Sequence, residues 1–556
     1  MTALASLHPG ARRDQWRWRA PQVEQYSGAI RAALLADLEA HDAADYVAGN
    51  QRLAETHRKL QAAHFSLAFD EQAVRDHAEN YARLCARMSS LAQRATFAEW
   101  LGVESPAGKS ITPEGAAARL DDPLWWRRQL RKVWTRAAEN AQRDLGLIRR
   151  GRAPYASDEA VRQRAAQKRR MRAYLENHVA VNEEGEQLLL LDAAEKSLAN
   201  PALRRGEFMC RVRGFEEIAR DLGHVAEFVT LTTPSRFHAQ LAGGGRNPAF
   251  ERAIVRDAQA WLCQQWARAR AKLKRLSVLF YGFRIAEPHH DATPHWHLLL
   301  FVAPRNLDTL RGVLKAAWLR ESGDEAGARD HRVKFESVDP AKGSAVGYIA
   351  KYVSKNIDGK GAIGDDSDRE TGNTVTSGLE RVAAWAALHG VRQFQQIGGP
   401  PVGLWREARR LHDRVPDPDM ERARERADAG DWRGFTRSVG GIHAGRRTNL
   451  RLERCERGDL NRYAEPRPAA IIGLRYASAV AITRPHQWRI ERQSCASISV
   501  RATAWKQAGH ARAGSVSLFD SFHLGPVAIT VRGAAESGAP SAWSNPNETS
   551  QAGPKE

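Results

Sequence analysis

The feature that most constrains the fold is an apolar segment at residues 293–302 that carries two histidines, His295 and His297. Successive side chains of a β-strand point to opposite faces, so residues two apart share a face. A strand here places both imidazoles on one side of a sheet and apolar side chains on the other: Leu298, Leu300 and Val302. Such a pair can converge on one metal ion, although an isolated His-x-His also suits two partly exposed polar residues.

A second apolar segment, residues 277–287, ends at Glu287 and predicts a neighbouring strand. Alternate residues in phase with this glutamate are apolar: Leu279, Tyr281, Phe283 and Ile285. The short segment 288–294 begins and ends with proline and returns the chain, so we expect the two strands to pair antiparallel. This pairing brings Glu287 beside the two histidines.

Two imidazoles and one carboxylate form a mixed nitrogen and oxygen site. Such a site suits a divalent cofactor that acts on phosphate oxygens, Mg²⁺ or Mn²⁺, and is less typical of zinc because it has no thiolate. Three residues of the connecting loop, His289, His290 and Asp291, are alternative ligands. We rank them below Glu287, since loop residues beside a site more often face solvent or substrate.

Residues 339–359 predict one helix, with Asp339 as its N-cap, Pro340 at its first position and Gly359 at its end. An apolar stripe repeats at helical spacing: Val346, Ile349, Ala350, Val353 and Ile357. The opposite face carries two tyrosines and two lysines: Tyr348, Lys351, Tyr352 and Lys355. An ordinary amphipathic helix with solvated lysines is the alternative, but its tyrosines would then be expected nearer the stripe.

Three segments, taken in order, resemble the motifs of HUH endonucleases, which initiate rolling-circle replication. They are residues 228–234, the strand with the two histidines, and residues 348–355. Two tyrosines with a lysine before the second are most similar to the replication gene A proteins of tailed double-stranded phages and their prophages. Residues 394–407 resemble the same family, and the resemblance covers roughly residues 205–415.

The resemblance implies an α+β fold with an HUH endonuclease core, a central antiparallel sheet with packed helices. It implies a divalent metal bound by His295, His297 and Glu287. It also implies a set of catalytic residues on the predicted helix: Tyr348, Tyr352, Lys351 and Lys355. The two lysines would hold the DNA backbone or favour the ionised form of a tyrosine.

The reaction implied is site- and strand-specific nicking and strand transfer that starts rolling-circle replication of a phage or prophage genome. A tyrosine hydroxyl has a pKa of about 10 and is a weak nucleophile at neutral pH, so it needs an electrophile. Attack on DNA leaves a 5′-phosphotyrosine and a free 3′-hydroxyl, which conserves the bond energy. A second tyrosine can cut the regenerated origin while the first still holds the earlier 5′ end.

The charge of the chain agrees with a nucleic-acid partner. It has 84 Lys and Arg against 65 Asp and Glu, a formal charge of +19, which favours single-stranded or supercoiled origin DNA. Candidate DNA contacts are Thr230, Thr232, Arg236, Lys168, Arg169 and Arg170. The basic segment 164–172 is equally compatible with the solvated face of a helix.

The five cysteines form no Cys-x-x-Cys pair, which favours a reducing compartment over a disulfide framework or a zinc finger. The first residues lack the apolar core of a signal peptide, and no apolar run is long enough to span a bilayer. We therefore expect the protein in the bacterial host cytoplasm, with no membrane contact.

The length of 556 residues predicts several domains. Residues 1–205 have helical periodicity and predict a helical N-terminal region, and residues 206–400 predict the endonuclease domain. Residues 401–535 predict a mixed accessory region, and residues 536–556 a disordered tail.

No ATP binding is expected. Gly108, Lys109 and Ser110 end like a phosphate-binding loop, but Val103 occupies the required first glycine position. We therefore expect the protein to depend on the host replicative helicase and polymerase machinery. Two other functions agree with the residues, a metal-dependent hydrolase with structural tyrosines and a non-catalytic origin-binding protein.

Overall fold

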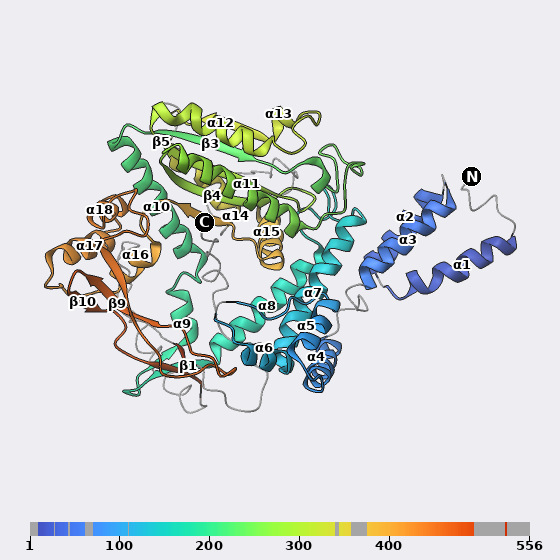
Figure 1. Ribbon diagram of the computed structural model, residues 1–556, viewed down its shortest axis with the longest axis horizontal. Helices are drawn as coiled ribbons and strands as arrows, with labels where there is room; N and C mark the ends of the chain where they lie inside the picture. Colours follow the sequence, from blue (N-terminus) through green and yellow to red (C-terminus); the bar gives the residue numbers. More distant parts are fainter. Residues whose placement is uncertain are drawn as a thin grey trace, which may run out of the picture.

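The computed structural model describes residues 9–26, 28–42, 45–61, 71–108, 110–339, 344–356, 375–493 and 529–530. The predicted tail at 536–556, together with Lys109, Pro340, Ile357 and Gly359, lies outside these residues. Within them the fold mixes many helices with antiparallel sheets (Figure 1). No helix in the described ranges is long and apolar enough to cross a membrane.

The first part of the chain is mainly helical, as its periodicity predicts. Its helices are α1 (Pro9–Glu24), α2 (Gly28–Asp42), α3 (Tyr46–Gln61), α4 (Glu71–Ala86), α5 (Leu91–Trp100), α6 (Pro113–Leu120), α7 (Pro123–Asp144), α8 (Asp158–Glu176) and α9 (Leu190–Glu195). Helices α1 to α3 project from the body as an arm (Figure 1). Their apolar residues pack with Ala141, Leu145 and Leu147, at the end of α7 and just beyond it, so the arm rests on this helix.

A five-stranded sheet lies at the centre of the fold, in the order β6-β3-β5-β4-β7. Its strands are β3 (Val225–Leu231), β4 (Phe280–Pro288), β5 (Pro294–Val302), β6 (Val333–Ser337) and β7 (Phe394–Ile397). Every adjacent pair is antiparallel. The predicted antiparallel sheet is therefore confirmed, and the histidine strand β5 is its middle strand.

Helices cover both faces of this sheet. One face packs on α11 (Val255–Arg275) and α12 (Leu307–Trp318) through a core that contains Leu298, Leu300 and Val302, as the alternation of β5 predicts. The other face packs on α10 (Pro201–Asp221) and α14 (Ala345–Asn356). Helix α15 (Val375–His389) completes the helices of this part, with α13 (Ala328–His331) before β6. Helix α14 thus lies on the face to which β5 directs its histidines.

Helix α14 begins later than the sequence predicts. The predicted N-cap, Asp339, is wrong, because the cap is Ser344, whose hydroxyl accepts a hydrogen bond from the amide of Gly347 at 3.1 Å. The amide of Ala345 donates to the Glu216 carboxylate on α10 at 2.8 Å. These two bonds satisfy amides of the first turn, which have no partner within the helix.

The core of the sheet continues into the C-terminal part of the chain. Helices α16 (Val402–Ala408), α17 (Pro418–Asp428) and α18 (Trp432–Ser438) share one apolar cluster with α10 and β4. A second antiparallel sheet, β10-β9-β8, joins the same cluster and consists of β8 (Leu450–Cys455), β9 (Ala470–Tyr476) and β10 (Ala479–Ile482). The apolar packing therefore crosses residue 400.

A third sheet joins distant parts of the chain, in the order β12-β11-β1-β2. It contains β1 (His178–Asn182), β2 (Gln187–Leu189), β11 (Trp488–Arg492) and β12 (Ile529–Thr530). Strand β1 pairs antiparallel with β11, so His178 lies opposite Arg492. This pairing connects the N-terminal helices to the C-terminal part of the described chain.

Candidate metal centre and nucleophile helix

The β4–β5 hairpin brings Glu287, His295 and His297 together. Glu287 and His295 are direct cross-strand partners, and His297 follows His295 by two residues on β5. All three side chains therefore lie on one face of the sheet. The two Nε2 atoms are 3.0 Å apart, and a Glu287 carboxylate oxygen lies 3.7 Å from that of His297 and 4.0 Å from that of His295. The three side chains are 2%, 5% and 8% exposed.

This geometry fits a metal ion. The ligand atoms of the three residues lie within 4.8 Å of one another, as they must to bind one ion. Two imidazole nitrogens and one carboxylate leave further coordination positions open to water or substrate. Two groups among the described residues could hold a metal, this buried one and a more exposed one formed by Glu184, Glu186 and His486, and the buried group is the one that the alternation of β4 and β5 predicts.

Strand β3 supports the site from one side. The Thr230 hydroxyl lies 3.0 Å from Nδ1 of His297, its cross-strand partner. When Nδ1–H donates to this hydroxyl, the lone pair of the ring is on Nε2, the nitrogen that faces His295 and Glu287. We predicted Thr230 as a DNA contact, but its position also lets it orient a metal ligand.

Tyr348 lies close to the histidines through one intervening ring. The Phe228 ring stacks on His297 with centroids 5.5 Å apart and an interplanar angle of 19°, and it contacts the Tyr348 ring at 6.0 Å. Tyr348 is half-buried at the edge of the core. The backbone of α14 continues through Lys351, Tyr352 and Lys355, but the side chains of these three residues lie outside the described part of the structure.

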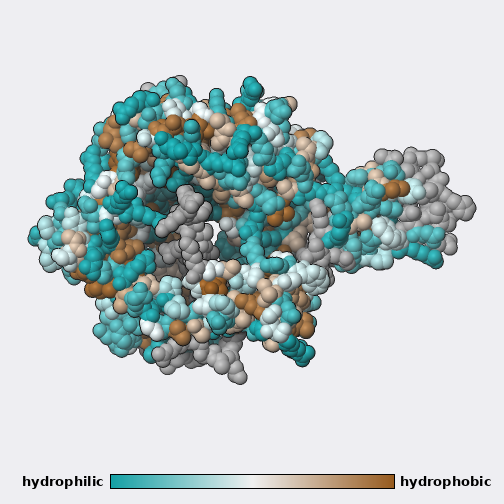
Figure 2. Space-filling model, in the orientation of Figure 1, coloured by the Kyte–Doolittle hydropathy of each residue, from teal (hydrophilic) through white to brown (hydrophobic). Residues whose placement is uncertain are grey.

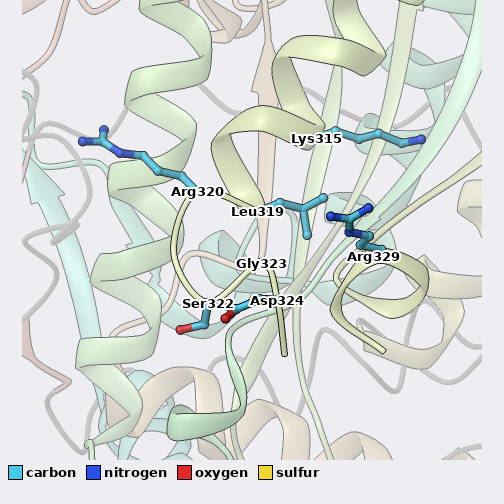
Figure 3. Close-up of a pocket in the computed structure, with 7 residues that line it drawn as sticks. All are labelled: Lys315, Leu319, Arg320, Ser322, Gly323, Asp324 and Arg329. Atoms are coloured by element: carbon cyan, nitrogen blue, oxygen red, sulfur yellow. The ribbon is translucent and has the colours of Figure 1, made fainter. Parts of the chain in front are cut away.

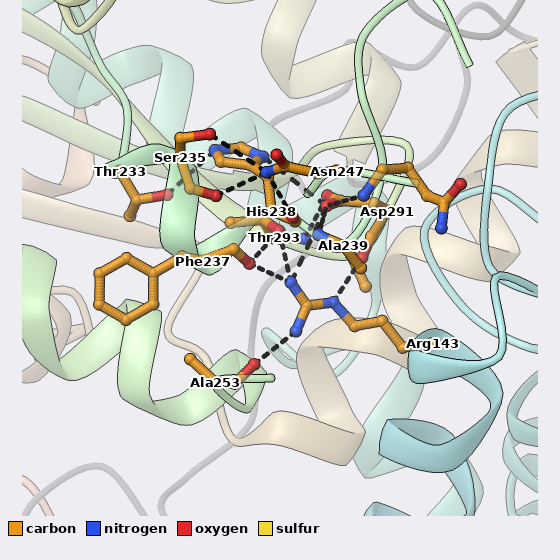
Figure 4. A network of polar contacts seen from close by, with 12 residues as sticks. Arg143, Thr233, Ser235, Phe237, His238, Ala239, Asn247, Ala253, Asp291 and Thr293 are labelled. Carbon is orange, nitrogen blue, oxygen red and sulfur yellow. Dashed lines mark hydrogen bonds and ion pairs between the residues drawn. The ribbon is translucent and has the colours of Figure 1, made fainter. Parts of the chain in front are cut away.

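Asp291, an alternative metal ligand from the sequence, holds the connecting loop instead (Figure 4). Its carboxylate accepts hydrogen bonds from the amide of Ala239 at 2.7 Å and the amide of Thr293 at 3.0 Å. Burial favours the neutral acid, but His238, Arg143 and His289 outweigh it and hold the pKa of Asp291 well below its usual range. Asp291 is therefore a buried anion that does not belong to the group of three candidate ligands.

Arg143 on α7 is the main partner of this loop and was not identified from the sequence. It donates to the carbonyls of Asp291 at 2.8 Å, Ala253 at 2.7 Å and Phe237, and to the Thr293 hydroxyl at 2.8 Å. It also lies 3.8 Å from the Asp291 carboxylate, and both side chains are almost completely buried. A helix of the N-terminal region thus fixes the turn that connects Glu287 to His295.

The other two alternative ligands, His289 and His290, line a cavity beside the centre. The His289 ring stacks on His295 with centroids 4.0 Å apart and an interplanar angle of 28°. His289 therefore contacts a candidate metal ligand through its ring face. It does not belong to the group of ligand atoms within 4.8 Å.

The remaining predicted DNA contacts have other protein partners or are exposed. The Thr232 hydroxyl donates to the His331 carbonyl at 3.3 Å, and Arg236 pairs with Glu321 at 2.5 Å and Glu251 at 3.5 Å. These carboxylates already neutralise much of the Arg236 charge. The three basic residues of α8 are exposed: Lys168, Arg169 and Arg170. More generally, hydrophilic residues cover most of the face of the molecule that Figure 2 shows.

A second cavity of about 550 Å³ lies at the end of α12, on the side of the sheet opposite the histidines. Figure 3 shows three basic residues around it: Lys315, Arg320 and Arg329. Lys315 and Arg329 extend to one side, whereas Arg320 points away from them (Figure 3). The sheet separates this cavity from the candidate metal centre.

Comparison with known proteins places these features in a family. Residues 45–360 match the family described as bacteriophage replication gene A protein. The replication gene A protein of Escherichia phage 186 is 39% identical over 388 residues, which cover 67% of this chain and 56% of that protein. The probable replication protein P12 of Pseudoalteromonas phage PM2 is 37% identical over 389 residues, 68% of this chain and 60% of that protein.

A probable replication endonuclease from a prophage-like region of Salmonella typhi is 36% identical over 351 residues, 60% of this chain and 44% of that protein. The chain thus spans about three fifths or less of the length of these relatives. No solved structure matches the chain. The match over more than half of its residues shows that the chain belongs to the bacteriophage replication gene A protein family.

Proposed function

We propose that this chain is a site- and strand-specific DNA endonuclease and strand transferase that initiates rolling-circle replication of a phage or prophage genome. The observation that carries the proposal is the position of Tyr348, whose ring contacts Phe228, which in turn stacks on His297. A tyrosine beside a group of metal-binding side chains is suited to attack a phosphodiester, and the antiparallel sheet supports an HUH endonuclease core. The named relatives include replication endonucleases, in agreement with this chemistry.

In the proposed reaction, the phenolic oxygen of Tyr348 or Tyr352 attacks the phosphorus of the scissile phosphodiester. The new bond joins the tyrosine to the 5′ phosphate, and the bond from phosphorus to the O3′ atom of the preceding nucleotide breaks. The phenol loses its proton to solvent or base, and the released O3′ gains one. Reversal with another 3′-hydroxyl joins strands, so the same residues perform transfer.

The residues of the chain have separate tasks in this scheme. Glu287, His295 and His297 would bind Mg²⁺ or Mn²⁺, which supplies positive charge to the scissile phosphate. Thr230 and Phe228 orient His297. Lys351 and Lys355 are proposed to hold the DNA backbone or favour the phenolate, and the exposed cations of α8 (Lys168, Arg169 and Arg170) to contact phosphates, with Thr232 and Arg236 as further candidates.

We further propose origin DNA, single-stranded or supercoiled, as the substrate, and the host replicative helicase and polymerase machinery as partners in the bacterial cytoplasm. Residues 206–400 would form the endonuclease domain, with residues 1–205 and 401–535 as helical and accessory regions. The proposal for two tyrosines is that each cuts in alternate rounds. They are one helical turn apart in α14, so both could reach one phosphate in turn.

Incubation with labelled single-stranded origin DNA, followed by a denaturing gel, tests the proposal. We expect labelled DNA to remain covalently on the protein, and His295→Ala with His297→Ala to abolish this adduct while DNA binding persists. Tyr348→Phe and Tyr352→Phe should each still form an adduct but fail at repeated cleavage and joining, and the double variant should form none. Free ends without an adduct would indicate a hydrolase, and intact DNA a binding protein, and either result would overturn the proposal.

A further inference from the structure

A cavity of about 370 Å³ lies beside the candidate metal centre, within the usual range of about 300–1,000 Å³ for ligand sites. Its walls come from the segment after α7, the loop after β3 and the turn between β4 and β5. They are Arg150, Ser235, His238, Gln240, Leu241, Ala242, Asn247, His289 and His290. No lining residue is a carboxylate, and Arg150 adds a positive charge. Three imidazole rings and one guanidinium in the lining therefore suit a ligand that has both a planar ring and a negative charge.

The cavity and Tyr348 approach different members of the histidine pair. His289 lines the cavity and stacks on His295 at 4.0 Å. Tyr348 approaches His297 through Phe228. The rings of His295 and His297 are 4.8 Å apart at their centroids, so a chain of ring contacts leads from the cavity through the two candidate ligands to the tyrosine.

The walls of the cavity are held in place by hydrogen bonds (Figure 4). The Asn247 amide donates to the carbonyls of Ser235 and His238, both at 2.8 Å. Behind the wall, the Asp291 carboxylate accepts the amides of Ala239 and Thr293 and is paired with Arg143. Because these groups are ordered by the fold, a ligand that enters loses little binding energy to rearrangement of the walls.

We infer that this cavity receives the nucleotide on the 5′ side of the scissile phosphodiester. The inference rests on the proposed function, because phosphoryl transfer places the attacking and leaving oxygens roughly in line through phosphorus. With Tyr348 attacking from the side of His297, the leaving O3′ points toward His295 and the cavity. The nucleotide that carries this O3′ then enters the cavity, where its base stacks on imidazole and its phosphate meets Arg150.

The test measures DNA binding without cleavage. A set of origin oligonucleotides, each with one abasic site, is titrated into the full chain in EDTA, and affinity is read by fluorescence anisotropy. Loss of the base immediately 5′ of the nick should weaken binding about tenfold or more, since base stacking contributes this much. Loss of the base on the 3′ side should have a smaller effect.

Two variants connect this effect to the cavity. Ala242→Trp, at an exposed lining position, should obstruct it, and Arg150→Ala should remove its guanidinium. Both should bind intact DNA more weakly and become insensitive to the abasic site 5′ of the nick. Arg149→Ala is the matched control, because Arg149 is exposed and adjacent in sequence but does not line the cavity. Thermal melts establish that all three variants are folded.

The inference fails if the variants keep the abasic profile of the unchanged protein, or if the largest effect falls on the 3′ side. Cleavage is measured separately on the intact oligonucleotide with Mn²⁺. Covalent cleavage with an unaltered profile would overturn the inference alone. Absence of an adduct would overturn the proposed function and, with it, the assignment of the 5′ nucleotide, even if the cavity binds a base.

Discussion

Replacement of Thr230 by valine tests whether the hydroxyl orients a metal ligand or contacts DNA. Valine retains the β-branched shape, so strand β3 should pack as before, and only the contact to Nδ1 of His297 at 3.0 Å is lost. Hydrogen-bond partners of metal-binding histidines typically contribute 10- to 100-fold to metal affinity, about 1.4–2.7 kcal/mol. Stacking on Phe228 still restrains the His297 ring, so we expect the lower end, about tenfold.

The assay is calorimetric titration of Mn²⁺ into the protein without DNA, followed by cleavage at increasing Mn²⁺. Thr230→Val should bind Mn²⁺ about tenfold more weakly and regain cleavage when the metal is raised to saturation. Thr232→Val is the control, because its hydroxyl donates to the His331 carbonyl and not to a histidine ring. Unchanged Mn²⁺ affinity with weakened DNA binding in EDTA would refute the reasoning and restore Thr230 as a DNA contact.

Three further predictions concern the surroundings of the site. Arg143→Met should lower the free energy of unfolding by about 3–5 kcal/mol in denaturant titrations, because it leaves Asp291 buried without its arginine partner, and adding Asp291→Asn should recover part of the loss. Phe228→Leu should slow adduct formation about 10- to 100-fold on the denaturing gel, since it removes the ring between His297 and Tyr348, and should lower Mn²⁺ affinity much less than this, since Thr230 still holds Nδ1 of His297. Burial raises the pKa of Glu139 from 4.5 to about 7, so the native state binds the extra proton and stability falls as pH rises from about 4.5 to 7. Glu139→Gln should therefore raise the unfolding free energy at pH 8, by on the order of 3 kcal/mol, and have little effect at pH 5; equal effects at both pH values would contradict the shift.

The candidate metal centre could be predicted because it depends on local rules. Strand alternation puts His295 and His297 on one face, and a short turn requires Glu287 to return beside them. The position of Tyr348 on the same face of the sheet was harder to predict from the sequence, since it depends on how α14 packs on the sheet. The predicted start of that helix was wrong because the prediction followed the Asp339–Pro340 pair, whereas the Ser344 hydroxyl accepts the amide of Gly347 and caps the helix.

The role of Arg143 could not be predicted from the sequence. It lies on a helix of the N-terminal region and binds carbonyls of two separate loops, the β3–α11 connection and the β4–β5 turn, and no periodicity records such a contact. The register between β3 and β5 is likewise a tertiary property. It places Thr230 opposite His297, where its hydroxyl can support a candidate metal ligand.

The pairing of β1 with β11 has a consequence for biosynthesis. At about 5–20 residues per second, the ribosome delivers Arg492 roughly 15 to 60 s after its partner His178. Until then the β1–β2 hairpin presents an unpaired edge that carries Val179, Ala180 and Val181, and a two-stranded hairpin is only marginally stable alone. The nascent chain therefore has a long interval in which this edge can pair with another chain. Slower synthesis at low temperature lengthens this interval. The interval and chaperone binding to β1 should together determine how much of the protein reaches its folded state.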